Sequence, residues 1–159
     1  MKTLLTFVLM ICAQGAWAGE GYDQFLIPVV PNAEVTPGDF CNEQDEHFLT
    51  YRYDEKIPYC ERHVNTWLKN KIYKEYQVPQ ECRHRYTIDH MVPLALGGNN
   101  NPHNLWPEHV LVKATRQALE NSLYHQVKRN EITTEEALQV IIDAKTKLNL
   151  DLSHVEGCG

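Results

Sequence analysis

The chain has 159 residues, of which 43% are hydrophobic and 23% are charged, and its formal net charge is −6 at pH 7. This length leaves room for one modest domain, and the sequence contains no internal repeat and no low-complexity tract. The acidic balance is unusual for a protein that contacts polyphosphate, so binding to nucleic acid would need a local basic surface.

The N-terminus has the three parts of an export signal. Lys2 precedes an apolar run from Leu4 to Ala13, and Ala16-Trp17-Ala18 provides a small-x-small cleavage site. The run is shorter than the roughly 20 apolar residues of a spanning helix, and no other segment qualifies. We expect residues 1–18 to be a cleaved signal peptide and the protein to be secreted or periplasmic, without a membrane anchor. Cleavage leaves 14 basic against 21 acidic residues, a net charge of −7.

Residues 19–58 form an acidic segment with strand-like fragments at 25–27 and 48–53. Four prolines interrupt it: Pro28, Pro31, Pro37 and Pro58. We expect an extended segment that wraps around the rest of the chain and is pinned by Cys41, rather than a separate domain.

A basic region follows, and its first part is predicted to be a helix over residues 61–77. The apolar face of this helix consists of Val64, Trp67, Leu68 and Ile72, and Pro79 ends it. Residues 62–85 hold six basic side chains against two acidic ones: Arg62, Lys69, Lys71, Lys74, Arg83 and Arg85 against Glu75 and Glu81. Solvated helix faces and phosphate contacts both remain open for these residues.

The next stretch, YTIDHMVPLALGGNNNPHNLWPE at 86–108, predicts two short strands joined by a loop. Residues 86–88 suit a strand that ends at Asp89-His90, and Gly97-Gly98 lets the backbone reverse. Residues 103–106 return as a second strand, which Pro107 is expected to terminate before a helix begins.

Two further helices are predicted. The first runs from about His109 to Arg129, with one apolar side and one coherent polar side. The second follows a capping box at Thr133 and Glu136, ends near Leu148, and is interpreted as scaffold.

Four cysteines remain after removal of the signal: Cys41, Cys60, Cys82 and Cys158. An even number in an oxidising compartment predicts two disulfides, with the pairing left open. Paired CxxC motifs, which a zinc knuckle would need, do not occur in the sequence.

The pattern DHMVPLALGG followed by NLWPE resembles the HNH endonucleases of the ββα-metal superfamily, in particular a secreted bacterial branch. The resemblance extends from about Tyr59 to Lys147. It implies an α+β fold with a ββα-metal core and flanking helices, and hydrolysis of phosphodiester bonds in DNA, RNA or both with low sequence specificity. It also implies that His90 is the general base, that Asp89 binds one divalent cation, and that Asn104 holds the loop and positions the base.

The residue types suit this chemistry. An imidazole has an unperturbed pKa near neutrality, so His90 can deprotonate water. A hard cation held by Asp89 can offset the extra negative charge of the transition state, and Mg²⁺ or Mn²⁺ is the expected ion. Because neighbouring residues of a strand point to opposite faces, the two side chains can share a metal and a water only if the chain turns between them. An Asn104 amide bonded to the loop backbone would fix such a turn.

One position departs from the HNH pattern. Many relatives carry a further metal ligand about nine residues beyond the asparagine, where this chain has Lys113, and an ammonium cannot bind a cation. Gln117, one turn further along the expected helix, is the preferred replacement, with Glu120 or the Asn99–Asn101 loop as alternatives. Lys113 and Arg116 would then contact phosphate.

These expectations divide the chain into a signal peptide at 1–18, an acidic segment at 19–58, a nuclease domain at 59–149 and a tail at 150–159. The rival hypothesis is a non-catalytic module of the same fold that binds nucleic acid or another partner. Oligomeric state, the choice between DNA and RNA, and biological role do not follow from the sequence.

Overall fold

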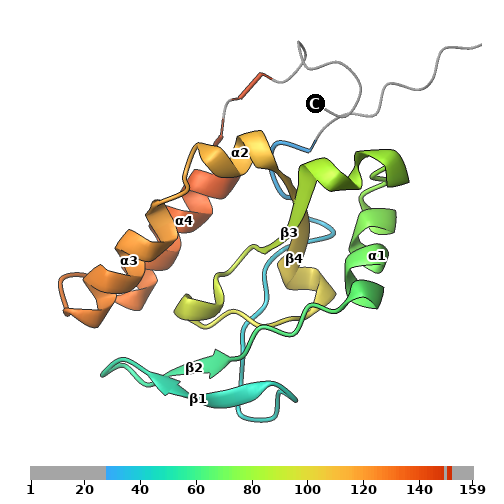
Figure 1. The fold of residues 1–159 in the computed structure, drawn as a ribbon. Coiled ribbons are helices and arrows are strands. Elements are labelled where there is room, and N and C mark those ends of the chain that lie inside the picture. Colours follow the sequence, from blue (N-terminus) through green and yellow to red (C-terminus); the bar gives the residue numbers. More distant parts are fainter. Residues whose placement is uncertain (1–27, 149, 152–159) are drawn as a thin grey trace, which may run out of the picture.

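A computed structural model describes residues 28–148, 150 and 151 of the protein. It is a mixed α+β structure with two small antiparallel sheets, flanking helices and a disulfide (Figure 1). The expected α+β class is therefore confirmed. The predicted signal peptide, the strand-like fragment at 25–27 and Cys158 lie outside the described residues. Among the described helices, none is both long and apolar enough to cross a membrane.

The central sheet pairs β3 (Tyr86–His90) with β4 (Leu105–His109). β4 continues through Pro107 to His109, so the expected termination at the proline is wrong. Met91 N donates to Asn104 O over 2.7 Å, and alternation from this bond leaves Pro107 at a non-hydrogen-bonded position. The missing N–H therefore costs the ladder nothing, because Pro107 turns its nitrogen to the open edge of a two-stranded sheet.

Helix α1 (Thr66–Glu75) covers one face of this sheet, and a 3-10 helix at Gln80–Arg85 leads from it into β3 (Figure 1). α1 is shorter than predicted because Asn65 caps it, accepting from Leu68 N at 2.9 Å. Apolar side chains from these elements form one core: Leu68, Ile72, Tyr73, Val78, Cys82, Tyr86, Ile88 and Leu105. Trp67, predicted to join the apolar face, is instead 71% exposed.

The opposite face carries α2 (Val110–Ala114), α3 (Leu119–Lys128) and α4 (Thr134–Thr146). The single helix expected from His109 to Arg129 is wrong, because four residues of turn separate α2 from α3. Thr115 Oγ1 donates to Val112 O over 2.7 Å and helps to end α2. The break changes which side chains of 110–128 share a face.

Helices α3 and α4 pack against each other around a second core (Figure 1). Its buried members are Leu96, Leu123, Val127, Ala137 and Ile141. The predicted capping box is confirmed: Thr133 and Glu136 bond reciprocally at the start of α4. Leu96 belongs to the loop after β3, so this core attaches the helix pair to the β3–β4 connection.

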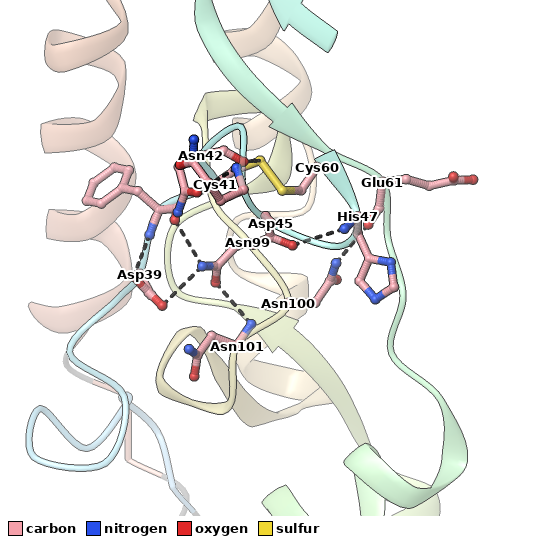
Figure 2. Close-up of a disulfide and its surroundings, with 12 residues drawn as sticks. Asp39, Cys41, Asn42, Asp45, His47, Cys60, Glu61, Asn99, Asn100 and Asn101 are labelled. Atoms are coloured by element: carbon pink, nitrogen blue, oxygen red, sulfur yellow. Dashed lines mark hydrogen bonds between the residues drawn. A yellow bond between two sulfur atoms is a disulfide. The ribbon is translucent and has the colours of Figure 1, made fainter. Parts of the chain in front are cut away.

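The segment before β1 (Phe48–Arg52) runs alongside the loop between β3 and β4. Gly38 N donates to His103 O at 3.0 Å, and Cys41 N donates to Gly97 O at 2.8 Å. A disulfide then joins Cys41 to Cys60 at the end of β2 (Ile57–Cys60), which pairs with β1 (Figure 2). One predicted disulfide is thus confirmed. Cys82 is also disulfide-bonded, and its pairing stays a prediction.

The Cys41–Cys60 bridge should contribute strongly to stability, because it closes a loop with a sequence separation of 19. Opening such a loop costs roughly 2–4 kcal/mol. Replacing both cysteines (Cys41→Ser with Cys60→Ser) should therefore lower the thermal unfolding midpoint, on the order of 10 °C. Scanning calorimetry of parent and variant measures the two midpoints, and equal midpoints would show that the bridge does not contribute to stability.

Candidate functional site

The site lies where β3 ends and its connection to β4 begins. β3 runs without interruption through Asp89 and His90, which pair with Trp106 and Leu105. The expected turn between the two residues is therefore wrong, and their side chains project from opposite faces of the strand. His90 lies on the face of Ile88, toward α1, and Asp89 lies on the face toward α2, α3 and α4.

Asn104 holds the loop, as the HNH resemblance implies. Its side chain is 0% exposed, and its amide donates to Val92 O at 3.0 Å and to Asn99 O at 2.9 Å. Its Oδ1 accepts from Val92 N at 2.8 Å and from Asp39 N at 3.3 Å. One buried amide thus joins both ends of the loop to the N-terminal segment. These bonds restrict the loop backbone to few conformations.

Gly98 allows this close packing. A Cβ at that position would meet Val92 O at 1.9 Å and Asn104 Nδ2 at 2.9 Å. Any other residue would push the loop away from the Asn104 amide. The Gly-Gly pair noted in the sequence therefore reverses the chain and also lets the loop pack closely against Val92 and Asn104.

The side chain of Asn100 fixes the protonation of the His90 ring. Asn100 Nδ2 donates to Glu61 O at 2.7 Å, and its Oδ1 accepts from His63 N at 3.0 Å, so two backbone groups set the orientation of the amide. The same Oδ1 lies 3.3 Å from His90 Nε2. Because an amide oxygen only accepts, Nε2 carries the proton and the lone pair of the neutral ring lies on Nδ1.

Arg62 lies against that lone pair. Its Nη1 is 3.1 Å from His90 Nδ1, and its Nη2 donates to Ile88 O at 2.9 Å. His90 is 4% exposed, whereas Arg62 is exposed to solvent. Burial, together with the Arg62 guanidinium, lowers the pKa of His90 to about 4. The ring is therefore neutral at pH 7, with its basic nitrogen covered by a surface cation.

On the other face of β3, Asp89 lies within 4 Å of three cations. Its carboxylate oxygens are 3.8 Å from Lys113 Nζ, 3.6 Å from Arg116 Nη2 and 3.6 Å from Lys145 Nζ. The carboxylate of Glu108 joins the same cluster: it contacts Arg116 directly and lies 3.7 Å from Lys113 Nζ. We call these five residues the Asp89 cluster.

The surroundings of the Asp89 cluster shift the pKa values of its two carboxyl groups in opposite directions. Burial alone would raise the pKa of Asp89, but Lys145 and the other cations outweigh burial and hold that pKa below its usual range. Burial and the neighbouring Asp89 carboxylate raise the pKa of Glu108 well above its ordinary value. Asp89 is thus the ionised member of the pair.

Lys113, Arg116 and Gln117, the substrate contacts and the helix ligand expected from the sequence, differ in how far they are exposed. Lys113 keeps its side chain 48% exposed, whereas the Arg116 side chain is 7% exposed and is paired with Glu108. Gln117 is exposed in the turn between α2 and α3. Because α2 ends at Ala114, Gln117 does not lie one turn beyond Lys113 on the same helix face, and the expected placement of this ligand is wrong.

The residues around Asp89 do not fit the divalent cation that the HNH resemblance implies. Within the described part of the chain, no group of three or more His, Cys, Asp or Glu side chains is placed to hold a metal ion. The Asp89 oxygens already face three positive charges, and a further double charge would be repelled by all three. The His90 ring, on the opposite face of the strand, completes no donor set with Asp89.

A hollow of about 460 Å³ opens beside the His90 side of the site. Its lining includes His63 and Asn100, the two residues whose contact orients the His90 neighbourhood, and the exposed Trp67. His47 and His63 stack there with ring centroids 4.2 Å apart. Figure 2 shows how the disulfide, His47 and the Asn99–Asn101 loop meet at this edge.

Three residues of the site were not assigned a role from the sequence: Arg62, Glu108 and Lys145. Asn100 was considered only within the Asn99–Asn101 loop, as an alternative source of a metal ligand, and not as a partner of His90. Arg62 and Glu108 had a signal, since they fall within the basic stretch and the NLWPE motif. Lys145 had none, because the α4 pattern indicated scaffold and a buried lysine is not expected from periodicity.

The low pKa of His90 has a consequence for stability. Arg62, Asp89 and Lys145 are the charged groups that act on its ring. Because the folded pKa of about 4 lies below the ordinary value of 6.5, the unfolded state binds more protons between these pH values. The free energy of unfolding should therefore rise by about 3 kcal/mol from pH 4 to 6.5 on account of His90.

Urea unfolding of parent and His90→Gln at several pH values measures this contribution. The difference in unfolding free energy between parent and variant should change by that amount across the interval. A constant difference would mean that His90 titrates at its ordinary pKa.

The chain was also compared with known proteins. No protein-family model, no curated protein and no solved structure matches it. Evidence for a function therefore comes from the chain's own residues and their geometry.

Proposed function

We propose that the protein is an endonuclease that hydrolyses phosphodiester bonds of DNA or RNA with low sequence specificity, as the HNH resemblance implies. The observation that carries the proposal is the state of His90. It is a buried, neutral imidazole whose tautomer is set by Asn100, with the lone pair of Nδ1 directed toward an exposed guanidinium. A purely structural histidine does not need its basic nitrogen directed at an exposed cation, and a shifted pKa with a specific charged partner is typical of functional sites.

In the proposed reaction, a phosphate binds Arg62 and draws its guanidinium away from His90. A water then takes the vacated place at Nδ1, and Nδ1 accepts a proton from this water as its oxygen attacks phosphorus. The bond from phosphorus to the leaving oxygen breaks, and that oxygen takes a proton from solvent. Asn100 keeps the proton on Nε2, so Nδ1 remains the atom that accepts a proton during the proposed reaction.

Negative charge on the phosphates of the substrate would be offset by side chains that reach the surface on the two faces of β3. Arg62 is exposed, and Lys113 is half exposed although its ammonium lies 3.8 Å from Asp89. Arg116 contributes indirectly: its pairing with buried Glu108 ties the turn after α2, the helix that carries Lys113, to β4. A bound Mg²⁺ or Mn²⁺ finds no support in the donor set, so no step is derived through it.

We further propose that β3, β4 and α2 make up the ββα core of that superfamily. The order strand, loop, strand and helix supports this, as does the Asn104 amide that closes the loop. Export to an oxidising compartment is also proposed, and the disulfide between Cys41 and Cys60 is compatible with it.

The test is cleavage of plasmid DNA and of structured RNA by the purified mature protein. His90→Ala should reduce the cleavage rate by roughly 10²–10⁴-fold, because it removes the general base. A gel assay with single-turnover kinetics measures the rate, and circular dichroism checks that the variant is folded.

His125→Ala is the matched control, since His125 is an exposed histidine on α3 outside the site. It should cleave like the parent. If parent and His90→Ala cleave equally, or if the parent binds nucleic acid without cleaving it, the endonuclease assignment fails. The second result would instead favour a binding module of the same fold.

A further inference from the structure

Lys145 is a buried lysine at the centre of the site. It stands on α4 with its side chain 0% exposed. The buried positions of α4 are Thr134, Ala137, Ile141 and Lys145, which recur at helical spacing. An apolar residue would continue this face at no electrostatic cost, whereas a buried ammonium requires compensating partners.

The partners of Lys145 are three oxygen groups, two from the end of β3 and one from α3. Its Nζ donates to His90 O at 2.6 Å, lies 2.8 Å from Glu120 Oε1 and lies 3.6 Å from Asp89 Oδ2. The oxygens of His90 and Glu120 lie within hydrogen-bond distance of the ammonium, and the Asp89 oxygen lies at ion-pair distance. Lys145 thereby links β3, α3 and α4 at a single point.

A backbone carbonyl and two carboxylates are also the donors that a hard divalent cation prefers. The Lys145 ammonium already lies where these oxygens converge. On its other side, the Asp89 carboxylate faces Lys113 and Arg116. An ion entering the site would have to displace the ammonium and remain close to two further positive charges.

We propose that Lys145 is the resident cation of this site, and that its ammonium takes the place of the divalent ion that the HNH resemblance implies. The binding part of this inference is independent of the proposed function, whereas its consequence for catalysis rests on it. Because Lys145 is fully buried, it touches no substrate and acts as a positioning residue. It holds the end of β3, and with it the His90 backbone, against α3 and α4.

The inference predicts that cleavage does not depend on a divalent ion. Charge on the phosphate beside His90 is met by the exposed Arg62 guanidinium, and Lys113, on the other face of the strand, is left for a neighbouring phosphate of the substrate. Activity of protein dialysed against EDTA should equal activity in Mg²⁺ or Mn²⁺. Loss of cleavage in EDTA with recovery in either metal would overturn the inference while leaving the endonuclease assignment in place.

Metal binding provides a readout that does not depend on activity. The mature protein, titrated with Mn²⁺ and followed by calorimetry and electron paramagnetic resonance, should show no saturable single site. The variant Lys145→Ala leaves the three oxygen groups without their cation and opens space between them. It should show a saturable Mn²⁺ site where the parent shows none, and Mn²⁺ should raise its thermal midpoint.

Lys147→Ala is the matched control, because Lys147 follows α4 with its side chain 72% exposed and pairs with Asp143 at the surface. It should bind Mn²⁺ as weakly as the parent. A single Mn²⁺ site in the parent that Asp89→Ala abolishes would overturn the inference, as would a folded Lys145→Ala variant with no gain in Mn²⁺ affinity. If Lys145→Ala does not fold, the Mn²⁺ titration of the parent still tests the inference, because a single site that depends on Asp89 would overturn it.

Discussion

The buried amide of Asn104 is the constraint on which the rest of the site depends. Its bonds to Val92 and Asn99 close the connection between the central strands, and its bond to Asp39 attaches the N-terminal segment to that connection. The loop in turn delivers Asn100 to the His90 ring. Without this amide several buried backbone groups would lose their partners at once, and the orientation of the imidazole would no longer be determined.

Strand β3 separates two chemical environments because consecutive side chains leave it on opposite faces. On one face, His90 is kept neutral by burial and by Arg62. On the other, Asp89 is kept ionised by three cations, one of which is fully buried. Lys145 contacts both environments, since it pairs with Asp89 and donates to the His90 carbonyl. The His90 residue and the Asp89 cluster are therefore coupled through the backbone rather than through a shared ligand.

The strand pair, the loop held by Asn104 and the capping box of α4 could be predicted, because they depend on local patterns: β-branched runs, a Gly-Gly reversal and a spaced Thr and Glu. The errors have a different origin. Pro107 stays in its strand because the sheet has an open edge, and the helix after His109 breaks near Arg116, a buried partner of Glu108. The burial of Lys145 depends on three partners that are distant in sequence, so no spacing rule could reveal it.

The central claim is that His90 presents a neutral ring with its lone pair on Nδ1. The most direct measurement is the ¹⁵N chemical shifts of the His90 ring nitrogens in labelled protein at pH 7, assigned by comparison with His90→Gln. The geometry predicts a protonated Nε2 and an unprotonated Nδ1, unchanged down to about pH 5, since the pKa is lowered to about 4. A proton on Nδ1, or a doubly protonated ring at pH 7, would contradict the account.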